Sequence, residues 1–146
     1  MKEELILECS ILMEQIRMYV LTCCNFTEMT RGDFMALDLF YEAQEKNEKL
    51  TVTSISSKTS VSKAAVSQMI KIMEKRKWVL RETDANDKRL VYVSLTDFGR
   101  EAFEKQRDIM TKNLKDCIAD MGESNLINLN SCLKMIAARI ACKKNT

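Results

Sequence analysis

The chain of 146 residues is long enough for one domain whose core needs no covalent cross-links, and 46% of its residues are hydrophobic while 30% are charged. It has no histidine, which excludes His-ligated zinc centres and His-based catalytic triads, and with no proline and three glycines it is a poor match to proline-kinked or glycine-rich architectures. Its net charge of +2, taken alone, argues against nucleic acid as a partner.

The first predicted element is a long amphipathic helix over about residues 3–23. Its apolar residues recur at intervals of three and four, at Leu5, Leu12, Ile16, Tyr19, Val20 and Cys23. Glu8, Glu14 and Arg17 interrupt the apolar run, so the sequence predicts neither a signal peptide nor a membrane-spanning helix. We therefore expect a cytoplasmic protein with no membrane partner.

A second helix is predicted after Thr30, which suits an N-cap because Asp33 follows three residues later. Its apolar stripe consists of Phe34, Leu37, Phe40 and Tyr41. The polar run 44–49 ends this helix, and the three residues 50–52 suffice only for a bridging strand.

Two short helices joined by a tight turn are predicted next, and this arrangement is a helix-turn-helix. Thr53 is the expected cap of the first helix, residues 59–61 form the turn, and Ser62 is the expected cap of the second helix, over about residues 63–77. One face of the second helix carries short, amide or basic side chains, namely Lys63, Ala64, Ser67, Gln68 and Lys71. Ser and Ala allow close approach to a DNA groove, Gln can pair with base edges, and Lys reaches phosphates or guanine.

The pattern then changes to that of a β-hairpin. Two β-rich runs, 78–81 and 90–93, flank a polar segment whose Asp84, Asn86 and Asp87 suit a turn without glycine. A hairpin in this place, with Lys88 and Arg89 near its tip, is typical of the wing of a winged helix. Such a wing brings cations within reach of an adjacent minor groove.

Two further helices complete the chain. Thr96 is the expected cap of a long helix, and residues 121–124 separate that helix from the last one. Trp78 opens a strand beside a core helix, which favours packing in the core over stacking on a base or ligand. The predicted fold class is mainly α with a small β-hairpin wing, as a winged helix-turn-helix flanked by N- and C-terminal helices.

Charge is spread unevenly along this chain. Residues 1–50 carry a net charge of −5, residues 51–90 a net charge of +5 and residues 91–146 a net charge of +2. Residues 51–81 hold seven basic side chains against the single acid Glu74, which is a footprint suited to phosphate contact. A solvated basic helix face explains the same charge equally well.

Two motifs in the second half of the chain are specific in combination: Asp87-x-Arg89, followed by Leu95-Thr96-x-x-Gly99. With the helix-turn-helix before them, they make residues 50–104 closely resemble the MarR family of winged-helix transcriptional regulators. The flanking helices match that family in order and length.

The resemblance implies a single domain, 1–146, with a winged-helix DNA-binding lobe at 31–95 and a helical dimerisation region at 1–24 and 96–146. It implies a homodimeric, sequence-specific repressor that reads a pseudo-palindromic site in double-stranded DNA. Long apolar stripes at both termini of a small chain also need a partner to cover them. The residues expected to contact or shape the contact with DNA are Thr53, Ser62, Lys63, Ala64, Ser67, Gln68, Lys71, Asp87, Lys88 and Arg89.

Three details of the resemblance concern the turns and the wing. The family often has glycine at the positions of Ser60 and Lys77, so two positions that tolerate a positive φ at low cost are lost here. Asp87 is expected to orient the wing by pairing with either Arg81 or Arg89, and the alternative is that Asp87 is a plain turn-forming residue.

The resemblance further implies a small phenolic or lipophilic effector that relieves DNA binding. The expected pocket walls are Met13, Arg17, Tyr19, Phe34, Asp38 and Tyr41, although a bare apolar interface explains these residues equally well. Hydroperoxide-sensing members carry a cysteine near the start of the first helix, where Cys9 lies, so a thiol-based oxidant sensor of the same fold is an alternative.

The six cysteines are otherwise expected to be small buried hydrophobes in a reducing cytosol. They form no Cys-x-x-Cys pair, so no metal site is predicted. A winged helix used as a protein-interaction module without DNA binding is a second alternative, but such modules usually lose the cations that remain here at Lys63, Lys71, Lys88 and Arg89. We expect neither an enzyme nor a cofactor, because a cysteine nucleophile would have no visible base.

Overall fold

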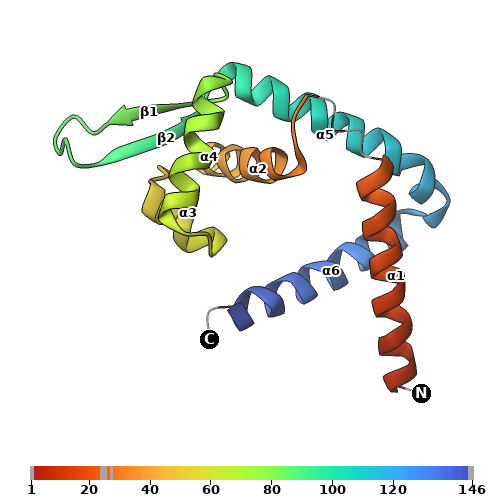
Figure 1. Cartoon of the computed structure of the whole chain (residues 1–146). Coiled ribbons are helices and arrows are strands. Elements are labelled where there is room, and N and C mark those ends of the chain that lie inside the picture. The colour runs from red at the N-terminus through yellow and green to blue at the C-terminus, as the bar shows by residue number, and fades with distance from the viewer. Residues whose placement is uncertain (1, 24–25, 27, 145–146) are drawn as a thin grey trace. The chain divides into compact units, whose positions relative to one another are not determined.

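The computed structural model describes residues 2–23, 26 and 28–144, with the side chains of residues 21, 23, 141 and 144 left aside. The chain divides into two compact units, residues 25–109 and residues 1–24 with 110–146, and each is described by itself (Figure 1). The first half of the helix that follows the hairpin therefore belongs to the same unit as the helix-turn-helix.

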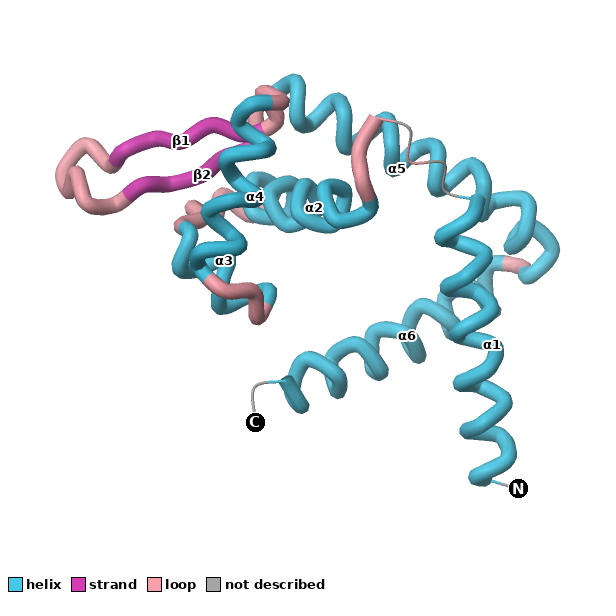
Figure 2. The backbone as a smooth tube through the Cα atoms, in the orientation of Figure 1, coloured by secondary structure: helices cyan, strands magenta, loops and turns pink. Residues whose placement is uncertain are grey.

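The unit at residues 25–109 is a winged helix, as predicted. It contains α2 (Arg31–Glu45), α3 (Val52–Thr59), α4 (Lys63–Lys75), β1 (Val79–Thr83), β2 (Val91–Leu95) and the start of α5 (Asp97–Ile118). The two strands are antiparallel, with Val79 opposite Leu95 and Thr83 opposite Val91 (Figure 2). Leu50 adds an isolated bridge to Val93, so the short strand predicted at 50–52 reduces to one residue.

The core of this unit lies where α2, α3, α4, β2 and α5 face one another. Its largest fully buried side chains are Phe40, Phe103, Leu37, Leu50, Ile55, Ile70, Met73 and Val66. Burial of each such side chain contributes roughly 1.5–3 kcal/mol, so these residues hold the helices in place. Phe34 stacks on Phe103 with ring centroids 4.9 Å apart, and Trp78 is only 5% exposed, which confirms its predicted place in the core.

The caps explain where these helices begin. Thr30 accepts a hydrogen bond from the backbone N–H of Asp33, and Asp33 accepts one from the N–H of Thr30, which confirms the predicted start of α2. For α3 the prediction of Thr53 as the cap is wrong, because Thr51 and Ser54 form the reciprocal pair two residues earlier. A threonine at 51 and a serine at 54 satisfy two N–H groups at once, whereas Thr53 lies inside the first turn.

The segment Thr96-x-x-Gly99 joins α5 to the hairpin. The Thr96 hydroxyl accepts from the Gly99 N–H at 2.9 Å and donates to the Lys77 carbonyl at 2.6 Å. A Cβ at Gly99 would lie 2.1 Å from the carbonyl oxygen of Trp78, so only glycine allows this approach. The motif is therefore a close backbone contact that fixes the base of the hairpin.

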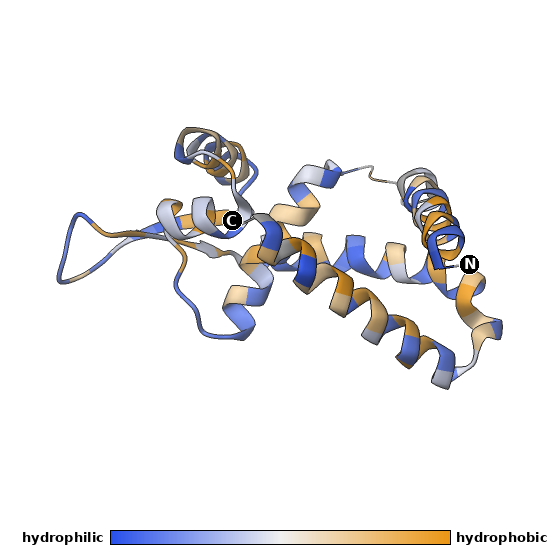
Figure 3. Cartoon of the chain, turned by 90° about the horizontal axis from the view of Figure 1, so that it is seen from below, coloured by the Kyte–Doolittle hydropathy of each residue, from blue (hydrophilic) through white to orange (hydrophobic). Residues whose placement is uncertain are grey.

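The second unit contains α1 (Lys2–Cys23), the end of α5, a short 3₁₀ helix (Ala119–Met121) and α6 (Glu123–Lys144). Gly122, with φ of 73°, separates the last two, as the predicted break at 121–124 requires. Apolar side chains on α1 and α6 are exposed, with Leu7 at 62% and Met135 at 71%, and Figure 3 colours such residues orange. No helix among the described residues is long and apolar enough to cross a membrane.

The cysteines of this unit depart from the prediction. Cys9, Cys117, Cys132 and Cys142 are all exposed in the single chain, so the expectation of buried cysteines is wrong for these four. Each lies on α1, on α6 or in the second half of α5, and large apolar side chains on α1 and α6 are also exposed in the single chain. Cys23 and Cys24 fall outside the described side chains.

Candidate nucleic-acid interface

The exposed face of α4 is the first part of the candidate interface. Ser62 caps the helix by accepting from the Ala65 N–H at 3.2 Å, and Val66, Ile70 and Met73 bury the opposite face. This anchoring leaves Lys63, Ala64, Gln68 and Lys71 exposed and Ser67 half-buried on one continuous side of the helix. Because both cap and apolar stripe are satisfied within the unit, the outward orientation of these five side chains is fixed by the fold.

The two helices of the helix-turn-helix are each followed by a residue in the left-handed region. Ser60, the C-cap of α3, has φ of 57°, and Lys77, after α4, has φ of 60°. The Trp78 N–H donates to the Met73 carbonyl and the Lys77 N–H donates to the Glu74 carbonyl, which is a Schellman motif. Ser60 and Lys77, where the family often has glycine, are therefore both positions at which the backbone adopts a positive φ.

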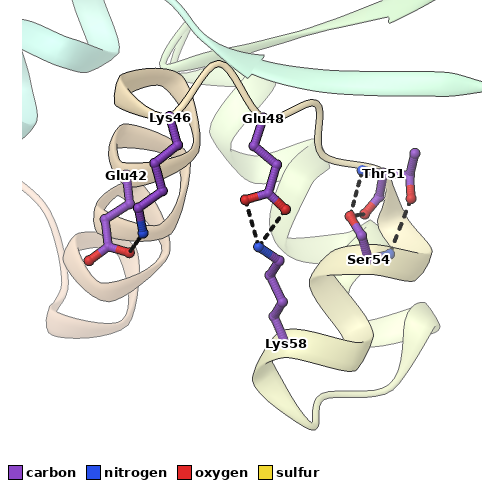
Figure 4. A network of polar contacts seen from close by, with 6 residues as sticks. All are labelled: Glu42, Lys46, Glu48, Thr51, Ser54 and Lys58. Carbon is purple, nitrogen blue, oxygen red and sulfur yellow. Dashed lines mark hydrogen bonds and ion pairs between the residues drawn. The ribbon is translucent and has the colours of Figure 1, made fainter.

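The position of α3 is set by contacts with the segment that precedes it (Figure 4). Lys58 forms an ion pair with Glu48 at 2.6 Å across the α2–α3 connection, while the Thr51–Ser54 pair closes the start of α3. Lys46 and Glu42 pair within the last turn of α2 at 3.3 Å. Thr53 is exposed in the first turn of α3, where a threonine hydroxyl can reach a phosphate.

The loop at residues 84–90 forms the tip of the wing without glycine or proline (Figure 2). The Asp84 carboxylate accepts from the N–H groups of Asn86 and Asp87 at 2.8 and 3.0 Å. The Asp87 carboxylate in turn accepts from the N–H and the Nε of Arg89 at 3.0 and 3.2 Å. The Arg89 side chain is nevertheless 92% exposed, and Lys88 beside it is also exposed.

Ion pairs divide the cations of residues 51–81 into two groups. Lys58 pairs with Glu48, Arg76 with Asp33 at 3.1 Å, and Arg81 with Glu74 at 3.0 Å. No ion pair is formed, within the part of the chain that the structure describes, by Lys63, Lys71, Lys75 or Lys77. Of the two partners expected for Asp87, the structure shows Arg89, because Glu74 engages Arg81.

Sequence reasoning missed two residues of this interface. Asp84 was treated only as a turn former, although the spacing Asp-x-Asn-Asp is the signal of a side chain that accepts from N–H groups two and three residues later. Lys75 was counted in the charge but not as a site residue, although it lies one helical turn beyond Lys71 on the same exposed face.

The residues predicted to line an effector pocket fall in both units. In residues 25–109, Arg100 and Arg107 lie over the Tyr41 ring at 4.7 and 5.2 Å. Asp38 is half-buried, and this burial, followed by the nearby Glu42, raises the pKa of its carboxyl while Arg107 partly opposes the shift. Phe34 belongs to the stacked core pair described above.

The other three predicted pocket residues, Met13, Arg17 and Tyr19, are exposed on α1 in the second unit. Arg17 forms an ion pair with Glu14, and the Tyr19 hydroxyl accepts from the Cys117 thiol at 3.0 Å. Exposure does not single out Cys9 from Cys117, Cys132 and Cys142, so the oxidant-sensing alternative gains no specific support. The described residues contain no group of three His, Cys, Asp or Glu side chains that could hold a metal ion.

Comparisons with known proteins converge on one family. Residues 29–91 match the family model described as MarR family. The HTH-type transcriptional regulator TcaR of Staphylococcus aureus is 35% identical over 100 residues, which is 67% of this chain and 66%, just under two thirds, of TcaR.

Solved structures show the same fold at lower identity. A MarR family protein from Bacillus stearothermophilus superposes with a TM-score of 0.76 at 18% identity, covering 96% of this chain and 98% of that one. A mutant MarR from E. coli complexed with operator DNA superposes with a TM-score of 0.65 at 20% identity, covering 90% and 94% of the two chains.

Proposed function

This chain belongs to the MarR family, and we propose that it is a homodimeric transcriptional repressor that binds a pseudo-palindromic site in double-stranded DNA. The matched relatives are named as transcriptional regulators, and one structural neighbour is complexed with operator DNA. Because the proposed ligand is genomic DNA, the proposed compartment is the cytoplasm. Neither the family nor these relatives are enzymes, and the proposed activity is binding without chemistry on the DNA.

The observation that carries the proposal is the exposed face of α4. Its cations, Lys63, Lys71 and Lys75, have no carboxylate partner among the described residues, whereas Lys58, Arg76 and Arg81 beside it do. An unpaired basic stripe on a helix of a helix-turn-helix is the electrostatic footprint of a recognition helix. This contrast between unpaired cations on the face and paired cations beside it favours a DNA-binding face over a merely solvated one.

The proposed contacts divide into two classes. The first class binds phosphates or lines the adjacent minor groove, and its cations release counterions from the DNA. It consists of Lys63, Lys71, Lys88 and Arg89, together with Thr53 and the N-terminal region of α4 at Ser62. Ser67 and Gln68 hydrogen-bond to base edges, and Ala64 accommodates a thymine methyl group. Substitutions in the first class should weaken binding to all sequences, and substitutions in the second should relax preference at particular base pairs.

Dimerisation is proposed from the apolar helices of the second unit. Exposed side chains such as Leu7, Ile11, Ile136 and Ile140 lie on α1 and α6, where a single chain leaves them facing water. Contiguous exposed apolar surface of this kind marks a protein–protein interface, and a second copy of the chain would cover it on both partners. The two copies would then present two recognition helices to half-sites about 10–10.5 base pairs apart or a multiple of this.

Relief by a small phenolic or lipophilic effector is a further part of the proposal. The aromatic rings of Phe34, Tyr41 and Phe103 form a cluster that Arg100 and Arg107 cover, and the half-buried Asp38 is one turn from Phe34. Apolar surface with a few polar groups is typical of small-molecule sites. An effector that binds here should raise the thermal midpoint and lower DNA affinity together, and a compound that does only the first acts elsewhere.

The decisive experiment is selection of bound duplexes from a random-sequence pool, followed by salt titration of the winner. We expect an inverted repeat whose half-sites are one helical turn apart or a multiple of this, and a dimer on the duplex by light scattering. Arg89→Ala should weaken binding to selected and scrambled duplexes alike, whereas Gln68→Ala should affect mainly the selected one. If the protein is folded and dimeric in solution but the selection recovers no preferred sequence, the result would instead support a protein-interaction module.

A further inference from the structure

We propose that Asp84 is the positioning residue of the wing, which holds Arg89 in place for DNA by way of Asp87. The inference rests on the proposed DNA-binding function, since it assigns the residue that shapes one of its contacts. Asp84 itself would not touch DNA: it would act through two other residues of the same loop.

The geometry forms a relay of two carboxylates. Asp84 Oδ1 accepts from the N–H groups of Asn86 and Asp87 at 2.8 and 3.0 Å, which turns the backbone at the point where Asp87 projects its own side chain. Asp87 Oδ1 then accepts from both the N–H and the Nε of Arg89. The guanidinium that is to enter the groove is therefore held at its Nε, while its remaining N–H groups stay free to meet an acceptor.

Asp84 is the side chain that bonds two backbone N–H groups of the loop, whereas Asp87 bonds one, that of Arg89. Residues 84–90 contain no glycine or proline, and the backbone closes only through the Asp84 N–H to the Leu90 carbonyl and the Leu90 N–H to the Asp87 carbonyl. The side chain of Asp84 supplies two further bonds to the interior of the loop. Because the Arg89 side chain is 92% exposed, no packing around it substitutes for this support.

The surroundings of Asp84 keep its carboxylate ionised and in place. The N–H groups of Asp87 and Asn86, in that order, lower the pKa of the Asp84 carboxyl, and Lys49 and Tyr92 lower it further. Lys49 lies over the Tyr92 ring at 4.7 Å, so the end of the α2–α3 connection also contacts the strand that leaves the loop.

An acid so close to a DNA-binding tip allows a test in which two explanations predict opposite signs. If Asp84 acted only through its negative charge, Asp84→Ala would strengthen DNA binding, because a repulsive charge is removed. Glu82→Ala is the matched control, since it removes the same charge from the same hairpin and the described residues give its side chain no hydrogen bond or ion pair. Positioning predicts instead that Asp84→Ala weakens binding while Glu82→Ala does not.

The experiment measures the affinity of full-length variants for the selected duplex and a scrambled duplex of equal length, over a range of salt concentrations. We expect Asp84→Ala to weaken binding by about fivefold and to reduce the salt slope by about one, as Arg89→Ala does. Asp84→Asn should bind within about twofold of wild type, because its amide oxygen accepts the same two N–H bonds. In an Arg89→Ala background, Asp84→Ala should change affinity by less than about twofold, because both act through one contact.

The outcomes separate the inference from the proposed function. An Asp84→Ala variant that binds as tightly as Glu82→Ala, or that loses the same factor with and without Arg89, overturns the positioning role alone. A wild-type protein that prefers no duplex, or an Arg89→Ala variant with an unchanged salt slope, means that the proposed function or its wing contact has failed, and the role of Asp84 fails with it. The midpoint of thermal unfolding is measured for the same variants. If that of Asp84→Ala is within error of wild type, its loss of DNA affinity is not caused by unfolding.

Discussion

Replacement of Lys77 by glycine should stabilise this protein, although it removes a side chain and adds no contact. Lys77 follows α4 with φ of 60°, a conformation in which the Cβ of any L-residue crowds the following backbone. The Schellman bonds from the Lys77 and Trp78 N–H groups require that conformation, so the chain cannot relax out of it. Buried Met73 and Trp78, which flank the motif, hold it in place.

The expected magnitude follows from two opposing terms. The left-handed conformation costs a non-glycine residue about 1–2 kcal/mol, which Lys77→Gly removes from the folded state. Glycine in turn loses roughly 0.5–1 kcal/mol more conformational freedom on folding. The net gain in the free energy of unfolding is then about 0.5–1 kcal/mol, equivalent to a rise of about 0.3–0.5 M in the urea midpoint.

The assay is urea unfolding at a fixed protein concentration, since a dimer would make the midpoint depend on concentration. Lys77→Ala is the control that removes the charge and the side chain but keeps the Cβ, and its midpoint should not rise. Asn47, with φ of 53° after α2, should gain less from the same change because asparagine tolerates this region better than lysine. A Lys77→Gly variant no more stable than Lys77→Ala would refute the reasoning.

Three further predictions follow from particular contacts. Gly99→Ala should lower the free energy of unfolding by at least about 2 kcal/mol in the same urea assay, because its Cβ would lie 2.1 Å from the Trp78 carbonyl oxygen. An unchanged urea midpoint would show that α5 and the hairpin can separate at little cost. Lys71→Ala should reduce the salt slope of DNA binding by about one. Arg81→Ala should leave the slope unchanged, because Arg81 is paired with Glu74. Equal changes in the two slopes would contradict the division of the cations into paired and unpaired groups. Because burial raises the pKa of Asp38 in the folded state, ionisation of this carboxyl opposes folding, so Asp38→Asn should be more stable than wild type at neutral pH. That advantage should shrink as pH falls through the raised folded-state pKa and be gone below the ordinary Asp pKa of about 3.9; a pH-independent difference would point to a lost contact instead.

Local signals in the sequence predicted most of the fold. The N-caps Thr30, Ser62 and Thr96 each precede a helix and each accept the expected backbone N–H, because capping depends only on residues within one turn. The prediction of Thr53 as a cap failed for the same local reason, since Thr51 offered a better-placed partner in Ser54. Hydrophobic periodicity placed the apolar stripe of α2 correctly, because Phe34, Leu37 and Phe40 recur every three residues and all three are buried.

The parts of the candidate site that the sequence did not predict depend on residues brought together by folding. Asp33 and Arg76 are 43 positions apart in the chain, and their ion pair exists because α2 packs near the end of α4. Glu74 could have neutralised several neighbouring cations, and only the path of β1 makes Arg81 its partner. The role of Asp84 was within reach, because it rests on a spacing of two and three residues rather than on tertiary packing.

These long-range pairs change the meaning of the charge distribution. The acidic residues 1–50 and the basic residues 51–90 carry net charges of −5 and +5, and their sum hides any preference for DNA. In the folded unit, Glu48 and Asp33 from the acidic segment neutralise Lys58 and Arg76, which flank α4, while the polar face of α4 meets no acid from that segment. Ion pairs that join the helices of the lobe thus neutralise cations beside α4 and leave those on its exposed face without a carboxylate partner among the described residues. A chain with a near-neutral total charge can therefore present a basic surface to DNA, while its other charged side chains form ion pairs or lie in solvent.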